Sequence, residues 1–343
     1  MVMALVLGHI SALEFWRTAQ PRAMENALRY RSSQGFGGFD PTSPAAPVPG
    51  ESRLVPFPEK PSAPRLREFR RSGVADFSSP LHVIVSNAAD RTRADDVICH
   101  VRPEPFPPGA LARIDGDVFV TSPELSFLHQ GSERDFPGLV GLGYELCGSY
   151  RLAPGTPRGF RDGPPLTSPE SIAWVIEQSG HSRGVKEARK ALPYLVSNAH
   201  SPMETVVALL LCLPVPRGGR GLPFPEMNGR IGVTDEAMRC TRRRYFECDL
   251  LWRVPGLALE YDSDAFHTGS DRIANDAARR NALASMGITV ITVGRRQVFD
   301  WREFNELVSV LEKRLGKRRR AGRRDWSEAQ YGLWHRLTSV GVR

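Results

Sequence analysis

The feature that most constrains this chain is a pair of short strand-like runs separated by a Pro-Gly turn signal. The runs are 249–252 and 257–262, and Pro255-Gly256 lies between them. Apolar and aromatic runs of this length on either side of Pro and Gly predict a β-hairpin. Because side chains alternate along a strand, Glu260 and Asp262 are expected to share one face of the second run.

The length of the hairpin loop decides where the carboxylate of Asp249 lies. A four-residue loop, 253–256, places Asp249 opposite Glu260. A two-residue loop, Pro255-Gly256, places it opposite Asp262. Opposed residues of an antiparallel pair project from the same face, so either even-length loop gathers the three carboxylates, and only an odd loop or a bulge separates them. Like charges in opposition repel, so such a face needs water, a proton or a cation to relieve it.

The positive charge of the chain is concentrated near its C-terminal end. The formal net charge is +8, and residues 313–324 hold eight basic residues and no acidic ones, which leaves the rest of the chain neutral. A neutral body with one basic strip favours a polyanionic partner such as DNA. The strip also suits a solvated helix end followed by a tail, since basic residues favour helix C-termini. Both interpretations stay open.

Cysteine usage and hydropathy exclude several classes of protein. The five cysteines show no Cys-x-x-Cys spacing, which favours reduced thiols over a disulfide framework or a zinc site. The apolar opening of the chain has no basic residues before it and is not typical of a signal peptide. The longest apolar run, 206–213, is too short to span a bilayer. We therefore expect a cytoplasmic protein with no membrane partner.

Changes in composition divide the chain into five segments. We expect an N-terminal helical segment over 1–35 and a linker rich in Pro, Gly and Ser over 36–65. The remaining segments are an α+β domain over 66–200, a second domain over 201–315 and a basic tail over 316–343.

Local signals place strands and helix starts within these segments. In the 66–200 domain, β-branched runs predict strands at 81–85, 97–101 and 117–121. Three helices are expected to begin with a Ser N-cap followed by Pro and an early acid, at Ser122, Ser168 and Ser201.

From Ser201 onward the pattern predicts the element order α-β-β-β-α-β-α. The expected elements are a helix over 202–213, strands at 230–233, 245–252 and 257–262, a helix over 271–286, a strand over 288–293 and a last helix from 300. Gly287 is well placed to end the middle helix, and Glu303 behind Asp300 completes a capping box. The β-branched run 288–293 is typical of a strand covered on both faces.

This order, with an acid on the middle strand and Glu-x-Asp on the next, resembles the PD-(D/E)XK nuclease fold, and within it the very-short-patch-repair-endonuclease-like group. The likeness covers 201–315. The matching residues are Ser201 to Thr205, Asp249-Leu250, Glu260-Tyr261-Asp262, His267, Asp276, Arg279, Arg280, Leu283, Gly287, Thr289 and Val290. The resemblance implies an α/β protein whose restriction-endonuclease-like core is preceded by a smaller α+β region.

The upstream segment resembles a different kind of protein. The runs Leu-His-Val-Ile-Val at 81–85 and Arg-Ile-Asp-Gly-Asp-Val-Phe-Val-Thr-Ser-Pro at 113–123 are similar to segments of abortive-infection-antitoxin-like bacterial proteins. That likeness implies a DNA-binding or regulatory domain.

Two positions depart from the nuclease-like pattern. Ser263 stands where the family has Gly. Asp262 stands where the pattern has the Lys that holds the attacking water. Members of the short-patch-repair type also lack that Lys and use histidine, which makes His267 the natural substitute.

The resemblance implies a metal-dependent DNA endonuclease acting in repair, restriction or phage defence. Phosphodiester hydrolysis uses a hard cation, here Mg²⁺ or Mn²⁺. Asp249 and Glu260 are the expected ligands, with Asp262 binding directly or through water and Glu204 in support. His267 would act as general base or as a donor to the phosphate. The residues expected to contact DNA are Arg242, Arg243, Arg244, Arg279, Arg280, Lys317, Arg318, Arg319 and Arg320.

Structural alternatives stay open for several of these residues. Glu204 occupies the capping-box position behind Ser201. His267 also suits a hydrogen bond within its own loop, and Asp276 and Arg280 form an i,i+4 pair that would stabilise a helix without chemistry. The alternative function is a non-catalytic DNA-binding or antitoxin-like transcriptional regulator that retains the nuclease fold. It predicts salt-sensitive DNA binding without cleavage.

Overall fold

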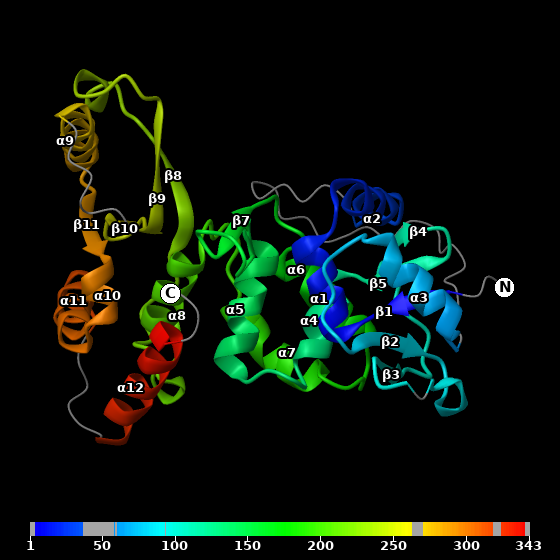
Figure 1. The fold of residues 1–343 in the computed structure, drawn as a ribbon. Helices are drawn as coiled ribbons and strands as arrows, with labels where there is room; N and C mark the ends of the chain where they lie inside the picture. The colour runs from blue at the N-terminus through cyan, green and yellow to red at the C-terminus, as the bar shows by residue number, and fades with distance from the viewer. Residues whose placement is uncertain are drawn as a thin grey trace. The chain divides into compact units, whose positions relative to one another are not determined.

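The computed structural model describes residues 4–36, 58, 60–92, 94–262, 270–317 and 324–339, without side-chain placement for 270–274 and 324–327. The protein is mixed α/β and divides into two compact units (Figure 1). Unit 1 comprises Met1–Cys147, Arg151–Ala153 and Pro164–Leu195, and unit 2 comprises Gly148–Tyr150, Pro154–Gly163 and Val196–Arg343. Two short strands, β6 (Tyr150–Leu152) and β7 (Phe160–Asp162), lie where the chain passes from one unit to the other.

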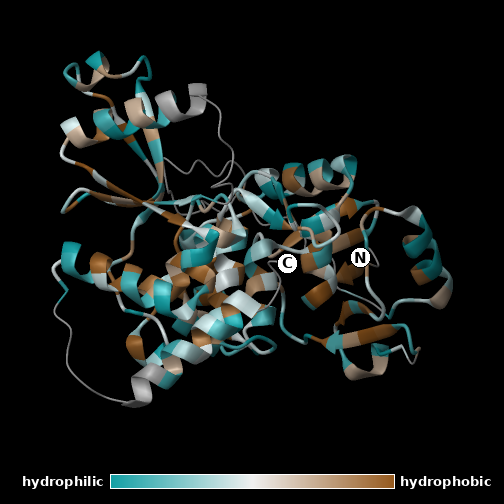
Figure 2. Ribbon diagram, turned by 60° about the vertical axis from the view of Figure 1, so that its left-hand side comes forward, coloured by the Kyte–Doolittle hydropathy of each residue, from teal (hydrophilic) through white to brown (hydrophobic). Residues whose placement is uncertain are grey.

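Unit 1 is built on a five-stranded sheet of order β3-β2-β1-β5-β4. Its strands are β1 (Leu5–Leu7), β2 (Leu81–Val85), β3 (Val97–Val101), β4 (Leu111–Asp115) and β5 (Val118–Thr121). β1 is antiparallel to β2 and parallel to β5, whereas β2 and β3 are parallel. Figure 2 shows the hydropathy of the chain; β1 and β2 are almost wholly buried, whereas β3 and β4 each have exposed positions.

The central strand corrects the expected domain boundary. The segment 1–35, expected to be helical and separate, supplies β1 as well as α1 (His9–Thr18) and α2 (Pro21–Ser33) of unit 1. All three residues of β1 are buried, and a run this short carries no alternation for a sequence pattern to detect. Its place between β2 and β5 is therefore set by long-range pairing.

Helices pack around this sheet. Besides α1 and α2 they are α3 (Ala63–Ser72), α4 (Pro123–Gln130), α5 (Phe136–Cys147), α6 (Pro169–Gln178) and α7 (Val185–Ala191). Every residue of α4 is buried, because α4 contacts α1, α5, α6 and α7. Ser122 and Ser168 cap α4 and α6 by accepting backbone N–H bonds, which confirms the predicted helix starts.

Unit 2 contains the element order predicted from Ser201 onward. The elements are α8 (Pro202–Cys212), β8 (Glu226–Gly232), β9 (Tyr245–Trp252), β10 (Leu257–Asp262), α9 (Ser270–Ser285), β11 (Thr289–Gly294), α10 (Arg295–Phe299), α11 (Trp301–Arg314) and α12 (Arg324–Ser339). The four strands form one sheet of order β11-β10-β9-β8. β8, β9 and β10 are antiparallel neighbours, and β10 and β11 are parallel on either side of α9 in sequence.

Most local signals of this unit are confirmed. Trp252 pairs with Leu257, so the hairpin has the four-residue loop that places Asp249 toward Glu260. Gly287 has a positive φ of 75°, as a residue that ends a helix requires. The side chain of Asp300 accepts a hydrogen bond from the backbone N of Glu303 at 2.9 Å and caps α11, but the Glu303 carboxylate pairs with Arg296 instead of completing the predicted capping box.

Two other expectations for unit 2 were wrong. β11 is an edge strand and its Thr292 is exposed, although its β-branched sequence suggested burial on both faces. The segment expected as a basic tail over 316–343 contains the helix α12. Leu333 and Trp334 of α12 are buried, and Trp334 Nε1 donates to the backbone oxygen of Val298 at 2.8 Å. Leu333 and Trp334 lie C-terminal to the basic strip 313–324, whose charge was the basis for predicting a tail.

Candidate acidic site

The first candidate side chain is Glu204, in the first turn of α8. Ser201 is the N-cap, and its Oγ accepts a hydrogen bond from the backbone N of Glu204 at 3.2 Å. The Glu204 carboxylate accepts bonds from Ser201 Oγ and from the backbone N of His200, each at 2.8 Å. The capping interpretation is therefore confirmed, and the carboxylate is held in place in a residue that is only 7% exposed.

A further donor to Glu204 comes from β8. Asn228 Nδ2 donates to Glu204 Oε2 at 2.6 Å and to the backbone oxygen of Asn198 at 2.9 Å. Asn228 has a φ of 48° and Asn198 a φ of 71°, a region that asparagine enters more readily than most L-residues. The sequence prediction missed Asn228. Its signal is the dipeptide with Gly229, because Asn-Gly marks a left-handed or turning backbone.

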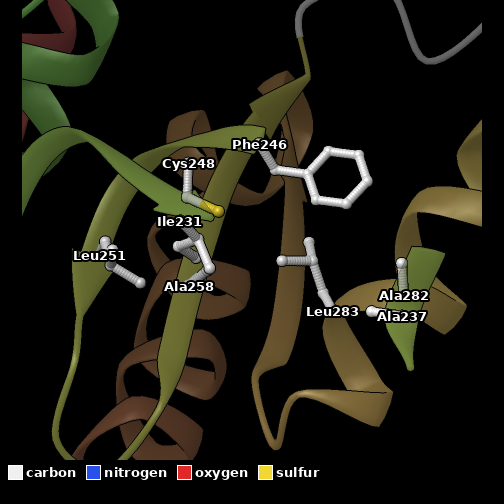
Figure 3. Close-up of a cluster of buried hydrophobic side chains, with 8 residues drawn as sticks. All are labelled: Ile231, Ala237, Phe246, Cys248, Leu251, Ala258, Ala282 and Leu283. Atoms are coloured by element: carbon white, nitrogen blue, oxygen red, sulfur yellow. The ribbon is translucent and has the colours of Figure 1, made fainter. Parts of the chain in front are cut away.

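The left-handed residue coincides with a change of face along β9. The β8–β9 ladder pairs Met227 with Leu250 and Gly229 with Cys248, and skips the position between them. Strict alternation would put Cys248 and Leu251 on opposite faces, but both lie in one buried cluster with Ala258 (Figure 3). The regular alternation assumed from the sequence is therefore broken next to Asp249.

Asp249 nevertheless lies close to the other two acids. Its Oδ2 accepts a hydrogen bond from the backbone N of Tyr261 in β10 at 2.8 Å. Burial, followed by the carboxylates of Glu204 and Glu260, raises the pKa of Asp249 from 3.8 to about 7, against the opposing effects of the Tyr261 bond and the Arg279 guanidinium. We call Glu204, Asp249 and Glu260 the acid group. Its members come from α8, β9 and β10.

Glu260 has a cationic partner from α9. Arg279 Nη2 donates to Glu260 Oε1 at 2.6 Å and to the backbone oxygen of Glu247 at 2.5 Å. The guanidinium also lies 5.2 Å from the centre of the Phe246 ring. Arg279, predicted to contact DNA, is thus the ion-pair partner of Glu260, and it offsets part of the negative charge of the acid group.

Of the other two predicted site residues, Asp262 and His267, the structure describes only Asp262. Asp262 is the last residue of β10, half-buried, with Gly294 of β11 as its ladder partner. His267 lies outside the described residues, so its role stays a prediction. Within the described ranges, no group of three or more His, Cys, Asp and Glu side chains is arranged to hold a metal ion.

The carboxylates of the acid group match in part the ligands preferred by the cation that the resemblance implies. Mg²⁺ prefers oxygen ligands and commonly uses one or two carboxylates together with water and substrate phosphate. Burial is the largest cause of the raised pKa of Asp249, and the carboxylates of Glu204 and Glu260 add to it, so a bound cation would relieve their repulsion. A site formed by Asp249 and Glu260 fits this chemistry if Glu260 exchanges Arg279 for the cation.

A basic cavity adjoins the acid group. It has a volume of about 830 Å³, and Arg279 belongs to its wall as well as to the ion pair with Glu260. The other arginines lining it are Arg239, Arg242 and Arg243, from η4 (Ala237–Arg239) and the turn that precedes β9. Arg242 and Arg243 were predicted as DNA contacts; Arg239 was missed because it stands apart from the Arg242–Arg244 run.

The other predicted basic residues do not line this cavity. Arg244 and Arg280 are exposed. Lys317 Nζ donates to the backbone oxygen of Arg220, and burial lowers the pKa of this lysine. Arg318, Arg319 and Arg320 lie outside the described residues. The structure therefore gathers only part of the predicted nucleic-acid-binding set in one place.

Comparison with known proteins adds little about chemistry. The chain matches two uncharacterized proteins of Mycobacterium tuberculosis, one from each of two strains. Each is 31% identical over 149 residues, which is 43% of this chain and 49% of the relative. The chain thus spans about half the length of the curated relatives it matches. No family model and no solved structure matches the chain.

A membrane-crossing role has no candidate helix among the described residues. None of their helices is both long enough and apolar enough to span a bilayer.

Proposed function

We propose that unit 2 is a metal-dependent DNA endonuclease domain with the PD-(D/E)XK arrangement. The observation that carries the proposal is the acid group next to an arginine-lined cavity. Burial, together with the neighbouring carboxylates of Glu204 and Glu260, raises the pKa of Asp249 to about 7, and the adjoining cavity has a volume of about 830 Å³. Phosphodiester hydrolysis requires carboxylates that bind a cation and, beside them, positively charged side chains that bind the phosphate.

In this proposal Asp249 and Glu260 hold the cation. A bound Mg²⁺ or Mn²⁺ would polarise the phosphate and supply hydroxide near neutral pH. Glu204, fixed by Ser201 and Asn228, keeps negative charge beside Asp249 without itself moving. His267 is the proposed base or phosphate donor, in place of the absent Lys.

Arg279 has a double role in this proposal. Its guanidinium pairs with Glu260 at 2.6 Å and also belongs to the cavity wall. Arginine binds phosphate and carboxylate through the same fork of N–H donors. Arrival of a phosphate in the cavity would therefore draw Arg279 away from Glu260 and free that carboxylate for the cation.

Cleavage by matched variants tests the proposal. Full-length protein is incubated with plasmid DNA and Mg²⁺ or Mn²⁺, and nicked and linear products are measured. Asp249→Asn and Glu260→Gln are expected to lower the rate more than about 100-fold, because each removes a ligand that supports several kcal/mol of transition-state stabilisation.

The control is Glu247→Gln on the same strand. Glu247 is a partly exposed carboxylate that pairs with Arg230 at 2.7 Å rather than with the acid group. This variant is expected to cleave at the wild-type rate. Equal rates for Asp249→Asn, Glu260→Gln and Glu247→Gln would refute the proposed site.

One observation favours a second candidate, DNA binding without cleavage. The Glu260–Arg279 ion pair already satisfies one acid, and within the described residues no three-ligand group is present. This candidate predicts that Arg242→Gln with Arg243→Gln weakens binding equally for all DNA sequences and reduces its salt dependence. Absence of cleavage with every divalent cation, together with that loss of binding, would favour it over the endonuclease.

A further inference from the structure

Unit 1 contains a stack of histidines that the endonuclease proposal does not use. His9 begins α1, His82 lies in β2, His100 in β3 and His129 in the last turn of α4. The His9 ring lies 3.5 Å from His100 and 4.3 Å from His129, centroid to centroid, with interplanar angles of 15° and 4°. His100 Nε2 is 3.0 Å from His82 Nδ1. We call these four residues the histidine group.

The backbone is strained to place His9 in this stack. His9 has a φ of 52°, in the left-handed region that residues other than glycine rarely adopt. A Cβ on the preceding Gly8 would lie 2.8 Å from the Ile84 side chain, so a larger residue at position 8 would require Ile84 to shift. His9 Nδ1 is 2.5 Å from Glu133 Oε1, which orients the ring.

A cavity of about 390 Å³ opens beside the stack. Three of the histidines line it, His9, His100 and His129, together with Arg91, Arg102 and Arg183. A volume of this size falls in the range of small-molecule sites.

The arginines of this cavity lack strong partners among the described residues. Arg91 and Arg183 make no ion pair there, and Arg102 Nε is buried without a hydrogen-bond partner. Glu104 is the acidic residue of the lining. The balance of charge at the cavity is therefore positive.

The histidines contribute neutral donors and acceptors beside these cations. Burial, with His9, His82 and Arg183 acting in the same direction, lowers the pKa of His100 to about 3. Burial, followed by His9, Arg102 and His100, places the pKa of His129 well below 6.5. Both rings are uncharged near pH 7, so each presents one N–H donor and one acceptor nitrogen.

The stacking geometry argues against a metal ion as the occupant. Imidazole lone pairs lie in the ring plane, and rings stacked face to face direct them side by side rather than toward a common point. Among the described residues, no group of three or more ligating side chains is arranged to hold a metal.

We propose that this cavity binds the terminal phosphate of a small phosphorylated ligand such as a mononucleotide. Arg91, Arg102 and Arg183 supply forked N–H donors that match phosphate oxygens. His100 and His129 supply additional neutral contacts from the wall. The site lies wholly within unit 1 and is independent of cleavage by unit 2.

Calorimetric titration of the full chain without divalent metal tests this site. The probes are inorganic phosphate, adenosine 5′-monophosphate and adenosine, and a trinucleotide with and without a 5′-phosphate. The phosphorylated member of each pair is expected to bind at least about tenfold more tightly than its unphosphorylated counterpart. The monophosphate binding more tightly than the 5′-phosphorylated trinucleotide indicates a small metabolite, and the reverse order indicates the end of a nucleic acid strand.

A matched pair of variants locates the binding. Arg183→Gln is expected to weaken monophosphate binding about tenfold with an unchanged circular dichroism spectrum and melting temperature. Arg189→Gln removes an exposed arginine of α7 that does not line the cavity, and it should leave the affinity unchanged. Equal affinity for adenosine and its monophosphate, undetectable binding of every probe, or equal affinity of both variants would overturn the proposal. Glu260→Gln should bind the monophosphate normally, which separates this result from the endonuclease test.

Discussion

The acid group of unit 2 and the histidine group of unit 1 both contain a side chain whose pKa is shifted toward the neutral form. The pKa is raised for the acid and lowered for the histidine. In each, ionisable side chains from distant parts of the sequence are crowded in a partly buried position. Crowding raises the pKa of Asp249 to about 7 and lowers the pKa of His100 to about 3. Both shifts move a group toward its neutral form, because burial and like charges each disfavour ionisation.

The difference between the groups indicates what each would bind. Besides burial, the carboxylates of Glu204 and Glu260 raise the pKa of Asp249, whereas His9, His82 and Arg183 lower that of His100, so the first site favours a cation and the second an anion. The acid group is relieved in part by Arg279, whereas Arg91 and Arg183 have no ion-pair partner among the described residues. A bound cation is therefore expected to stabilise unit 2, and a bound anion is expected to stabilise unit 1.

The largest expected effect is an opposite dependence of the two units on pH. The folded pKa of Asp249, about 7, is above its unfolded value of 3.8, so the unfolded state releases this proton first and unit 2 loses up to about 4 kcal/mol of stability as the pH rises from about 4 to about 7. Acidification from pH 8 to pH 5 should therefore stabilise unit 2. The folded pKa of His100 is below 6.5, so the unfolded state binds more protons below that pH and acidification should destabilise unit 1.

Hydrogen exchange measured peptide by peptide at pH 8, 6.5 and 5 checks this prediction. Protection of β9 and β10 should rise as the pH falls, and protection of β2 and β3 should decrease. Asp249→Asn should remove the dependence in unit 2 and leave unit 1 unchanged. A common direction of change in both units would contradict the comparison.

The next effect in size is stabilisation of unit 2 by a divalent cation. Mn²⁺ at about 100 times its dissociation constant should stabilise the wild type by about 2.7 kcal/mol, since it binds only the folded acid group. Thermal unfolding at pH 8 with and without Mn²⁺ measures this as a shift in melting temperature.

Asp249→Asn serves as the comparison for this measurement. It should be more stable than the wild type without metal, because it lacks the buried charge, and should gain nothing from Mn²⁺. An equal Mn²⁺ shift in both proteins would place the cation elsewhere.

The last expected effect, which compares two variants that differ by about 1 kcal/mol, concerns Asn228, the residue that fixes Glu204. Asn228→Gly keeps the left-handed backbone but removes a buried amide bond to a carboxylate, at a cost of about 1.5–3 kcal/mol. Asn228→Ala removes the same bond and adds about 1 kcal/mol of backbone strain. Urea unfolding of both variants separates the two contributions, and identical stabilities would show that the backbone is not strained here.

Much of unit 2 could be predicted from its sequence. The strands at 245–252 and 257–262, the cap at Ser201 and the end of α9 at Gly287 all follow from alternation, capping and turn chemistry within a few residues. The four-residue hairpin loop was one of two even lengths that would place Asp249 opposite an acid of β10, whereas an odd loop would have separated them.

Other features were beyond local patterns. The edge position of β11 and the helix α12 depend on partners far away in the chain, as does the central place of β1 in unit 1. The histidine group escaped prediction for the same reason, because residues 9, 82, 100 and 129 share no spacing that would mark them as neighbours.

For the strand pair around Pro255-Gly256, the sequence alone determined that two strands pair and that a loop of even length would place their acids on one face. That follows from the period of two in a strand and the short reach of a hairpin. Only the tertiary structure decided how Asp249 is surrounded: Glu204 arrives from α8, Arg279 from α9, and Asn228 turns left-handed in β8. Local periodicity is encoded in neighbouring residues, whereas the charge around a buried carboxylate depends on every element that packs against it.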